Sequence, residues 1–96
     1  VARIVQNGDR AFERQGYQDA LKYYEKALPR LDKAGQELVK IKILQAQRSM
    51  LIDDGDAEFR RGAFDAALKA YQKALELSPG GDIEQRIDRA KAQLAR

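Results

Sequence analysis

The chain has 96 residues, of which 44% are hydrophobic and 34% charged, a composition typical of one folded domain rather than of a disordered segment. It contains no Cys and no His, which excludes disulfides, thiolate chemistry and the usual nitrogen ligand and general base. We therefore expect no enzyme activity, no metal site and no cofactor. No apolar run approaches the ~20 residues of a membrane-spanning helix.

The formal net charge of +3 says little about partners, because opposite charges alternate along the whole chain. Short basic groups occur around Arg60 and Arg86, without the interleaved aromatic residues that stack on bases. We therefore expect no nucleic-acid partner.

Two stretches of 21 residues match each other at a constant offset of 47 and without a gap. Residues 8–28 read GDRAFERQGYQDALKYYEKAL, and residues 55–75 read GDAEFRRGAFDAALKAYQKAL. Such a match indicates a repeat architecture, in which each unit is one supersecondary element. The matched pairs include Gly8 and Gly55, Asp9 and Asp56, Phe12 and Phe59, Ala20 and Ala67, Tyr24 and Tyr71, and Leu28 and Leu75.

The predicted elements begin with a helix that ends near Arg14. A second helix starts at Tyr17 and continues to about Lys33, with a kink at Pro29 because proline lacks a backbone donor. We expect Gly35 to end this helix in the left-handed conformation that glycine adopts readily.

A long third helix is expected from about Gln36 to Arg61, because apolar residues recur there at helical spacing. The repeat places a fourth helix from Phe64 onward, and Asp82 is a good N-cap for a last helix over residues 82–96. We interpret this last helix as the cap that the end of a repeat array requires. The alternative is that it is the first helix of a third repeat.

The repeated sequence resembles the tetratricopeptide repeat (TPR) family. The small residue of the family pattern is Gly8 in one copy and Gly55 in the other, and Pro79 closes the second copy. A side chain at either glycine would collide with the second helix of its repeat, so glycine lets the two helices approach closely. The Ala-aromatic-Ala run of the family lies at Ala20, Tyr24 and Ala27, and again at Ala67, Tyr71 and Ala74.

The resemblance implies an all-α fold, a TPR-like α-solenoid of about five antiparallel helices in a single domain over residues 1–96. TPR units recur about every 34 residues, whereas these units recur every 47, so 13 residues form an insertion that extends the connecting hairpin. The implied parts are repeat 1 (about 1–34), the insertion (about 35–47), repeat 2 (about 48–81) and the capping helix (about 82–96).

The resemblance also implies a protein–protein interaction module or scaffold that binds a partner segment in a concave groove lined by the first helices of successive repeats. The two repeated phenylalanines would then be apolar anchors for the ligand, although each could instead pack on the next repeat. The implied groove residues are Val5, Asp9, Phe12, Glu13, Ser49, Ile52, Asp53, Asp56, Phe59, Arg60 and Arg86.

Some TPR domains bind the C-terminal carboxylate of chaperones through a Lys-Asn-Asn-Lys-Arg clamp. Positions that would match this clamp carry Val5, Asp9 and Asp53 in this chain. Because neighbouring carboxylates repel an anion, we expect a protein or peptide partner with a basic or amide-rich segment. The alternative is that these acids form only a solvated helix face.

A second interpretation of the function is a self-assembling structural module whose helical extension forms a homodimer or larger oligomer. Two repeats are fewer than the roughly three that a stable solenoid needs, and a second copy would supply the missing neighbour. The simpler alternative is that the apolar stripe of the extension packs in the protein's own core. The residues of this possible oligomer face are Leu31, Leu38, Val39, Ile41, Ile43 and Leu44.

Overall fold

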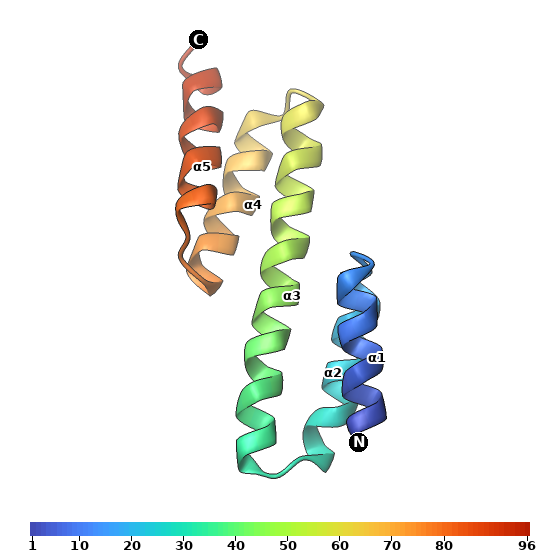
Figure 1. Ribbon diagram of the computed structural model, residues 1–96. Helices are drawn as coiled ribbons and strands as arrows, with labels where there is room; N and C mark the ends of the chain where they lie inside the picture. The colour runs from blue at the N-terminus through green and yellow to red at the C-terminus, as the bar shows by residue number, and fades with distance from the viewer. The chain divides into compact units, whose positions relative to one another are not determined.

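The computed structural model is all-α, as the sequence predicts, and confirms a TPR-like helical repeat. It describes residues 1–80 and 82–96 in full, and of Gly81 only the backbone. Within the described part of the chain, no helix combines the length and the apolar character that crossing a membrane requires. The elements are α1 (Ala2–Glu13), α2 (Tyr17–Ala27), the 3-10 turn η1 (Leu28–Arg30), α3 (Lys33–Arg60), α4 (Phe64–Leu77) and α5 (Gly81–Leu94) (Figure 1).

The chain divides into two compact units, and helix α3 contributes to both. Unit 1 (Val1–Gln47) contains α1, α2, η1 and the first part of α3. Unit 2 (Arg48–Arg96) contains the rest of α3, α4 and α5. Residues 35–47, predicted as an insertion, are thus the third helical segment of unit 1, whereas the single domain over 1–96 stays a prediction.

Each unit is built around an alanine-rich hairpin whose tyrosine ring lies against a glycine. A Cβ atom added at Gly8 would lie 2.5 Å from Cε1 of Tyr24, and one at Gly55 would lie 2.5 Å from Cε1 of Tyr71. No side chain fits at that distance in a packed interior. The prediction that these glycines permit close helix approach is therefore confirmed, and the atoms they make room for belong to the tyrosines.

The third helical segments of the two units correspond as well, but at an offset of 44 instead of 47. Val39 and Ile83 occupy the same place in their cores, at 3% and 0% exposure. The connection from the second to the third helical segment is therefore three residues longer in unit 1 than in unit 2. The corresponding residues are Val39, Lys42, Ile43 and Ala46 in unit 1 and Ile83, Arg86, Ile87 and Ala90 in unit 2.

This longer connection contradicts two sequence predictions. The second helix ends at Ala27 and does not continue to Lys33; Pro29 lies in the 3-10 turn and Leu31 is extended. Asp32 then starts α3, because its Oδ1 accepts a hydrogen bond from the backbone N–H of Gly35 at 2.8 Å. Gly35 is therefore in the first turn of α3 and is not a left-handed helix end.

The start of α5 also differs from the prediction. Gly80 is the N-cap residue, so Asp82 lies inside the first turn of α5 instead of capping it. The side chain of Asp82 is used elsewhere, since its carboxylate pairs with Arg48 and Arg86. Helix α5 packs on α4 through Ile83 and Ile87, which join the core of unit 2.

The turns after α1 and after the α3 helix share one geometry. Gln15 and Gly62 occupy matching positions, and both have positive φ, of 65° and 83°. In each turn the next residue donates a backbone hydrogen bond to the carbonyl oxygen five residues earlier. Gly16 donates to Ala11, and Ala63 donates to Glu58. These contacts define a Schellman motif, which normally places glycine at the left-handed position. The sequence repeat therefore preserves the turn even where unit 1 has glutamine.

Candidate protein-binding clefts

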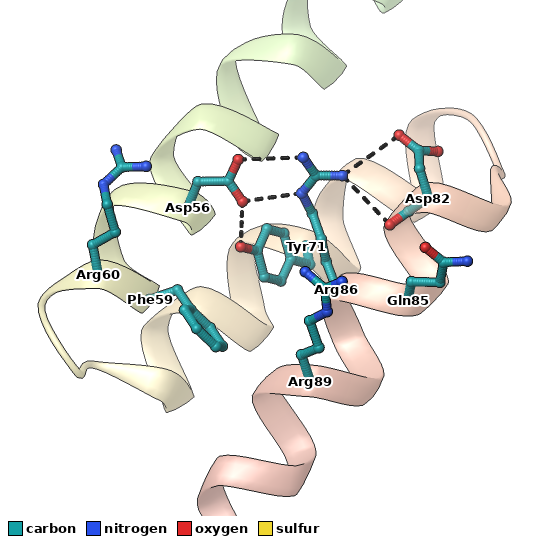
Figure 2. A pocket seen from close by; sticks show the side chains of 8 residues that line it. All are labelled: Asp56, Phe59, Arg60, Tyr71, Asp82, Gln85, Arg86 and Arg89. Carbon is teal, nitrogen blue, oxygen red and sulfur yellow. Dashed lines mark hydrogen bonds and ion pairs between the residues drawn. The ribbon is translucent and has the colours of Figure 1, made fainter.

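A half-buried aspartate–tyrosine–cation cluster connects the helical segments of each unit. In unit 2 the hydroxyl of Tyr71 donates to Oδ1 of Asp56 at 2.5 Å, and Nε of Arg86 donates to the same oxygen at 3.0 Å (Figure 2). The three side chains come from α4, α3 and α5, so the cluster joins all three helical segments of unit 2.

Unit 1 contains the same cluster with a different cation. The hydroxyl of Tyr24 donates to Oδ1 of Asp9 at 2.6 Å, and Nζ of Lys42 donates to it at 2.8 Å. The ammonium group of Lys42 also lies 5.9 Å from the centroid of the Tyr24 ring, within range of a cation–π contact. Lys42 and Arg86 are equivalent at the offset of 44, so both units use the same position.

The clusters hold their groups in defined protonation states. Burial raises the pKa of Asp9 and of Asp56, but hydrogen bonds from the tyrosine and the cation outweigh it, so both pKa values lie below the usual one. Burial and the hydrogen bond to Asp56 raise the pKa of Tyr71 to about 12. The pKa of Tyr24 is raised for the same reasons. At neutral pH each carboxylate is therefore ionised and each tyrosine keeps its proton.

A cleft lies beside each cluster. The cleft of unit 2 has a volume of about 380 Å³, and that of unit 1 has a volume of about 270 Å³. The unit 2 cleft is lined by Asp56, Phe59, Arg60, Tyr71, Asp82, Gln85, Arg86 and Arg89 (Figure 2). The unit 1 cleft is lined by Asp9, Phe12, Glu13, Tyr24, Lys42 and Gln45.

A phenylalanine at the same position of each unit links its core to its cleft. The Phe12 ring meets the Tyr17 ring edge-on, at 5.3 Å between centroids, and Phe59 meets Phe64 in the same way at 5.0 Å. Both Phe12 and Phe59 are half-buried, pack against the core of their own unit and also line its cleft. Each phenylalanine is therefore an apolar part of the cleft wall that also packs on the core.

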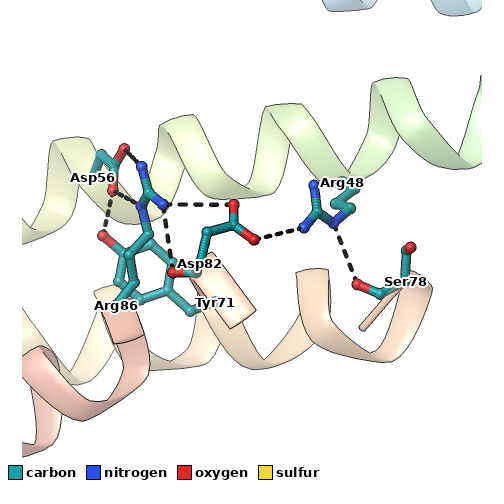
Figure 3. Close-up of polar contacts among 6 residues, drawn as sticks. All are labelled: Arg48, Asp56, Tyr71, Ser78, Asp82 and Arg86. Carbon is teal, nitrogen blue, oxygen red and sulfur yellow. Dashed lines mark hydrogen bonds and ion pairs between the residues drawn. The ribbon is translucent and has the colours of Figure 1, made fainter. Parts of the chain in front are cut away.

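Unit 2 continues its polar network away from the cleft. The Arg48 guanidinium donates to the carbonyl oxygen of Ser78 at 3.2 Å and to Oδ1 of Asp82 at 3.1 Å (Figure 3). The other oxygen of Asp82 lies 3.7 Å from Arg86. Arg48 thus fixes the connection between α4 and α5, and Asp82 holds Arg86 in line with Asp56.

Four predicted groove residues lie outside the described lining of these two clefts. Val5 packs against the core of unit 1, and Ile52 against that of unit 2. Ser49 is half-buried and Asp53 is exposed. A continuous groove shared by both units stays a prediction, whereas the other seven predicted residues line the cleft of one unit or the other.

Several cleft residues were missed by the sequence reasoning. Tyr24 and Tyr71 are predicted only as the aromatic residues of the Ala-aromatic-Ala run, although an aspartate recurs with each of them. Lys42 was missed because its equivalence to Arg86 appears only at the offset of 44. The signal was present in the pattern Val-x-x-Lys-Ile-x-x-Ala of residues 39–46, which matches Ile-x-x-Arg-Ile-x-x-Ala of residues 83–90. Gln45, Gln85 and Arg89 were also missed as lining residues.

The possible oligomer face separates into two groups. Val39 is buried, whereas Leu31 and Ile43 are half-buried and pack against the core of unit 1, so the possible oligomer face stays a prediction. Leu38, Ile41 and Leu44 are exposed, at 63%, 54% and 40%. Leu38 also borders an apolar hollow of about 310 Å³ in unit 1, together with Val5.

Comparison with known families agrees with this architecture. The family model of the TPR repeat matches residues 55–80, which begin at Gly55 and include all of α4. A search of curated proteins found no significant match to the chain. TPR repeats generally mediate protein–protein interaction, and TPR domains are typically not catalytic. The resemblance of this chain to the TPR family is therefore confirmed, and it rests on a TPR repeat at residues 55–80.

Proposed function

We propose that this chain is a non-catalytic protein-interaction module in which each unit binds a partner segment in its own cleft. The carrying observation is the repetition of one arrangement: the aspartate–tyrosine–cation cluster with a half-buried phenylalanine beside it. The cluster keeps three helical segments in place without a ligand, so the cleft walls are preorganised and binding does not have to order them.

In the cleft of unit 1, the proposed ligand is a basic or amide-rich segment. The acid that would attract it is Glu13, which is exposed and forms no ion pair among the described residues. Asp9 attracts a ligand less strongly, because its carboxylate already accepts hydrogen bonds from Tyr24 and Lys42. The exposed amide of Gln45 adds a donor and an acceptor on the opposite wall.

The test compares Glu13→Arg with Asp9→Asn, using a short lysine- and glutamine-rich peptide labelled for fluorescence anisotropy. Glu13→Arg should weaken binding by about tenfold, because it replaces attraction with repulsion at the rim. The melting temperature should stay unchanged, since Glu13 is exposed. Asp9→Asn should instead lower stability. Equal affinity of wild type and Glu13→Arg would contradict the proposed ligand for unit 1.

A second candidate function is self-association, and one specific observation favours it. Leu38, Ile41 and Leu44 follow one another on successive turns of α3 and are all exposed. Clusters of large exposed apolar side chains mark contact surfaces. Light scattering over a hundredfold concentration range should show an oligomer that Ile41→Lys converts to a monomer. An unchanged monomeric mass of the wild type at all concentrations would refute this candidate.

A further inference from the structure

The two clefts have the same residues on their inner wall, but the net charges of their linings are opposite. Asp9, Phe12 and Tyr24 recur in unit 2 at the offset of 47, and the cation recurs at the offset of 44. At two corresponding positions the lining differs in charge, since Glu13 becomes Arg60 and Gln45 becomes Arg89. The lining of unit 2 also includes Asp82 and Gln85, at the positions of Leu38 and Ile41 in unit 1.

These two exchanges add three positive charges, and Asp82 of unit 2 offsets one of them, so the net charge of the lining is reversed. The lining of unit 1 holds Asp9 and Glu13 against Lys42, a net charge of −1. The lining of unit 2 holds three arginines against two aspartates, a net charge of +1. Because the inner cluster is internally neutralised in both units, the rim residues set the field that a ligand meets.

The arginines of unit 2 differ in what they already bind. Arg86 is occupied by Asp56 and Asp82, at 3.0 Å and 3.7 Å. Arg60 and Arg89 are exposed, come from α3 and α5, and form no ion pair among the described residues (Figure 2). Two guanidinium groups are thus available on either side of a cleft whose wall includes the half-buried ring of Phe59.

We infer that the cleft of unit 2 binds an acidic segment of a partner protein, with Arg60 and Arg89 pairing its carboxylates and Phe59 contacting its apolar atoms. This inference rests on the proposed function, and it makes the two units selective for segments of opposite charge. Guanidinium groups bind carboxylates through paired hydrogen bonds, which supplies geometry as well as charge.

A protein ligand fits this cleft better than a polyphosphate backbone does. Only two arginines of this cleft form no ion pair among the described residues, whereas a nucleic-acid ligand places a phosphate on every residue. A peptide can present carboxylates only where the two free arginines lie, and place an apolar side chain over Phe59. An oligonucleotide is therefore the competing ligand that the experiment has to separate.

The test exchanges the two rims. Arg60→Glu combined with Arg89→Gln gives unit 2 the residues that unit 1 carries at the same positions, so the fold should tolerate them. Glu13→Arg combined with Gln45→Arg is the matched control in unit 1. The probe is a labelled peptide of alternating glutamate and leucine, blocked at both ends so that only side chains carry charge, with a lysine–leucine counterpart.

Wild type should bind the acidic peptide, and Arg60→Glu/Arg89→Gln should weaken that binding about tenfold or more at unchanged melting temperature. Arg60→Lys/Arg89→Lys should keep most of the binding, because the charge remains. The unit 1 control should leave the affinity for the acidic peptide unchanged or raise it. Added salt should weaken binding in the wild type more than in Arg60→Glu/Arg89→Gln.

Three results would overturn the inference: no binding of the acidic peptide by wild type, equal binding by the Arg60→Glu/Arg89→Gln variant, or tighter binding of an oligonucleotide of equal charge. Binding of the lysine–leucine peptide alone would leave the proposed function standing and remove only the assignment to unit 2. Binding of neither peptide, nor of any member of a random peptide library, would remove both.

Discussion

The hydroxyl of Tyr71 donates a hydrogen bond to the carboxylate of Asp56 at 2.5 Å, and Tyr24 does the same for Asp9 at 2.6 Å in the other unit. These bonds join the two helices of each hairpin on the face where the third segment adds its cation. The two aspartates, predicted as ligand contacts, thus each bind a tyrosine and a cation of their own unit.

Removal of one phenolic hydroxyl measures what this bond contributes. Tyr71→Phe keeps the ring that lies against Gly55 and deletes only the donor to Asp56. We expect a loss of about 1–2 kcal/mol in the free energy of unfolding, the usual effect of removing a partly buried hydrogen bond to a charged acceptor. Urea titration of wild type and variant gives this difference, and coincident titrations would contradict the role of the bond.

The same variant carries a pH signature at the alkaline end. The folded pKa of Tyr71 is about 12, above its unfolded value of 10.0, so the tyrosine contributes stability below pH 10 and loses it as pH rises through about 12. Wild type should therefore lose stability more steeply than Tyr71→Phe over that window. Tyr23, which is exposed, provides the control variant Tyr23→Phe, which should follow the wild-type curve.

Acid should weaken the clusters through their carboxylates. The folded pKa of Asp56 lies below the unfolded value of 3.8, because the hydrogen bonds from Tyr71 and Arg86 outweigh its burial. A depressed folded pKa contributes stability above pH 3.8 that is lost as pH falls through the folded pKa. The stability of wild type should fall in this range more than that of Asp56→Asn. Parallel acid curves for the two proteins would exclude a contribution of this carboxylate.

Unit 1 has glutamine where the matching turn of unit 2 has glycine. Gln15 adopts a φ of 65°, which disfavours any residue with a Cβ. Gln15→Gly should therefore raise the free energy of unfolding by about 0.5–1 kcal/mol. Gly62→Gln is the reciprocal change and should lower it by about 1 kcal/mol. Thermal unfolding of both variants measures this; a destabilised Gln15→Gly would show that the glutamine side chain has a role of its own.

Replacement of Gly55 or Gly62 by alanine should destabilise the protein for two different reasons. At Gly55 a Cβ atom would lie 2.5 Å from the Tyr71 ring, so Gly55→Ala should cost about 1–3 kcal/mol through overpacking. At Gly62 no atom lies within 4 Å of an added Cβ, and only the positive φ opposes alanine.

A second substitution distinguishes overpacking at Gly55 from the effect of positive φ at Gly62. Tyr71→Leu should partly rescue Gly55→Ala, because it removes the ring that the new methyl group meets, whereas it should leave the effect of Gly62→Ala unchanged. A double-mutant cycle with urea denaturation gives the coupling between the two sites. Full additivity of Gly55→Ala and Tyr71→Leu would show that the ring is not what excludes a side chain at this position.

Much of the fold could be predicted from the sequence, because it depends on local or repeated features. The offset of 47 placed Gly8 and Gly55 in equivalent hairpins, and the breaks near Gly16 and Gly62 placed the turns. The end of α2 could not be predicted in the same way. It depends on Pro29, which interrupts the helix, and on Asp32, which caps the next helix. The helical spacing of apolar residues continues through both positions, so it predicted a longer helix than the one that forms.

The repeat in the sequence was sufficient to predict two TPR-like hairpins, and it showed which aspartates and phenylalanines recur in them. That Asp9 and Asp56 each bind a tyrosine and a cation became visible in the packed helices, as did the position of Glu13, Arg60 and Arg89 in the lining of the clefts. The reason is that these contacts depend on how helices far apart in the chain are rotated against one another. Helical spacing assigns a residue to a face, but packing of the neighbouring helices determines which group that face meets.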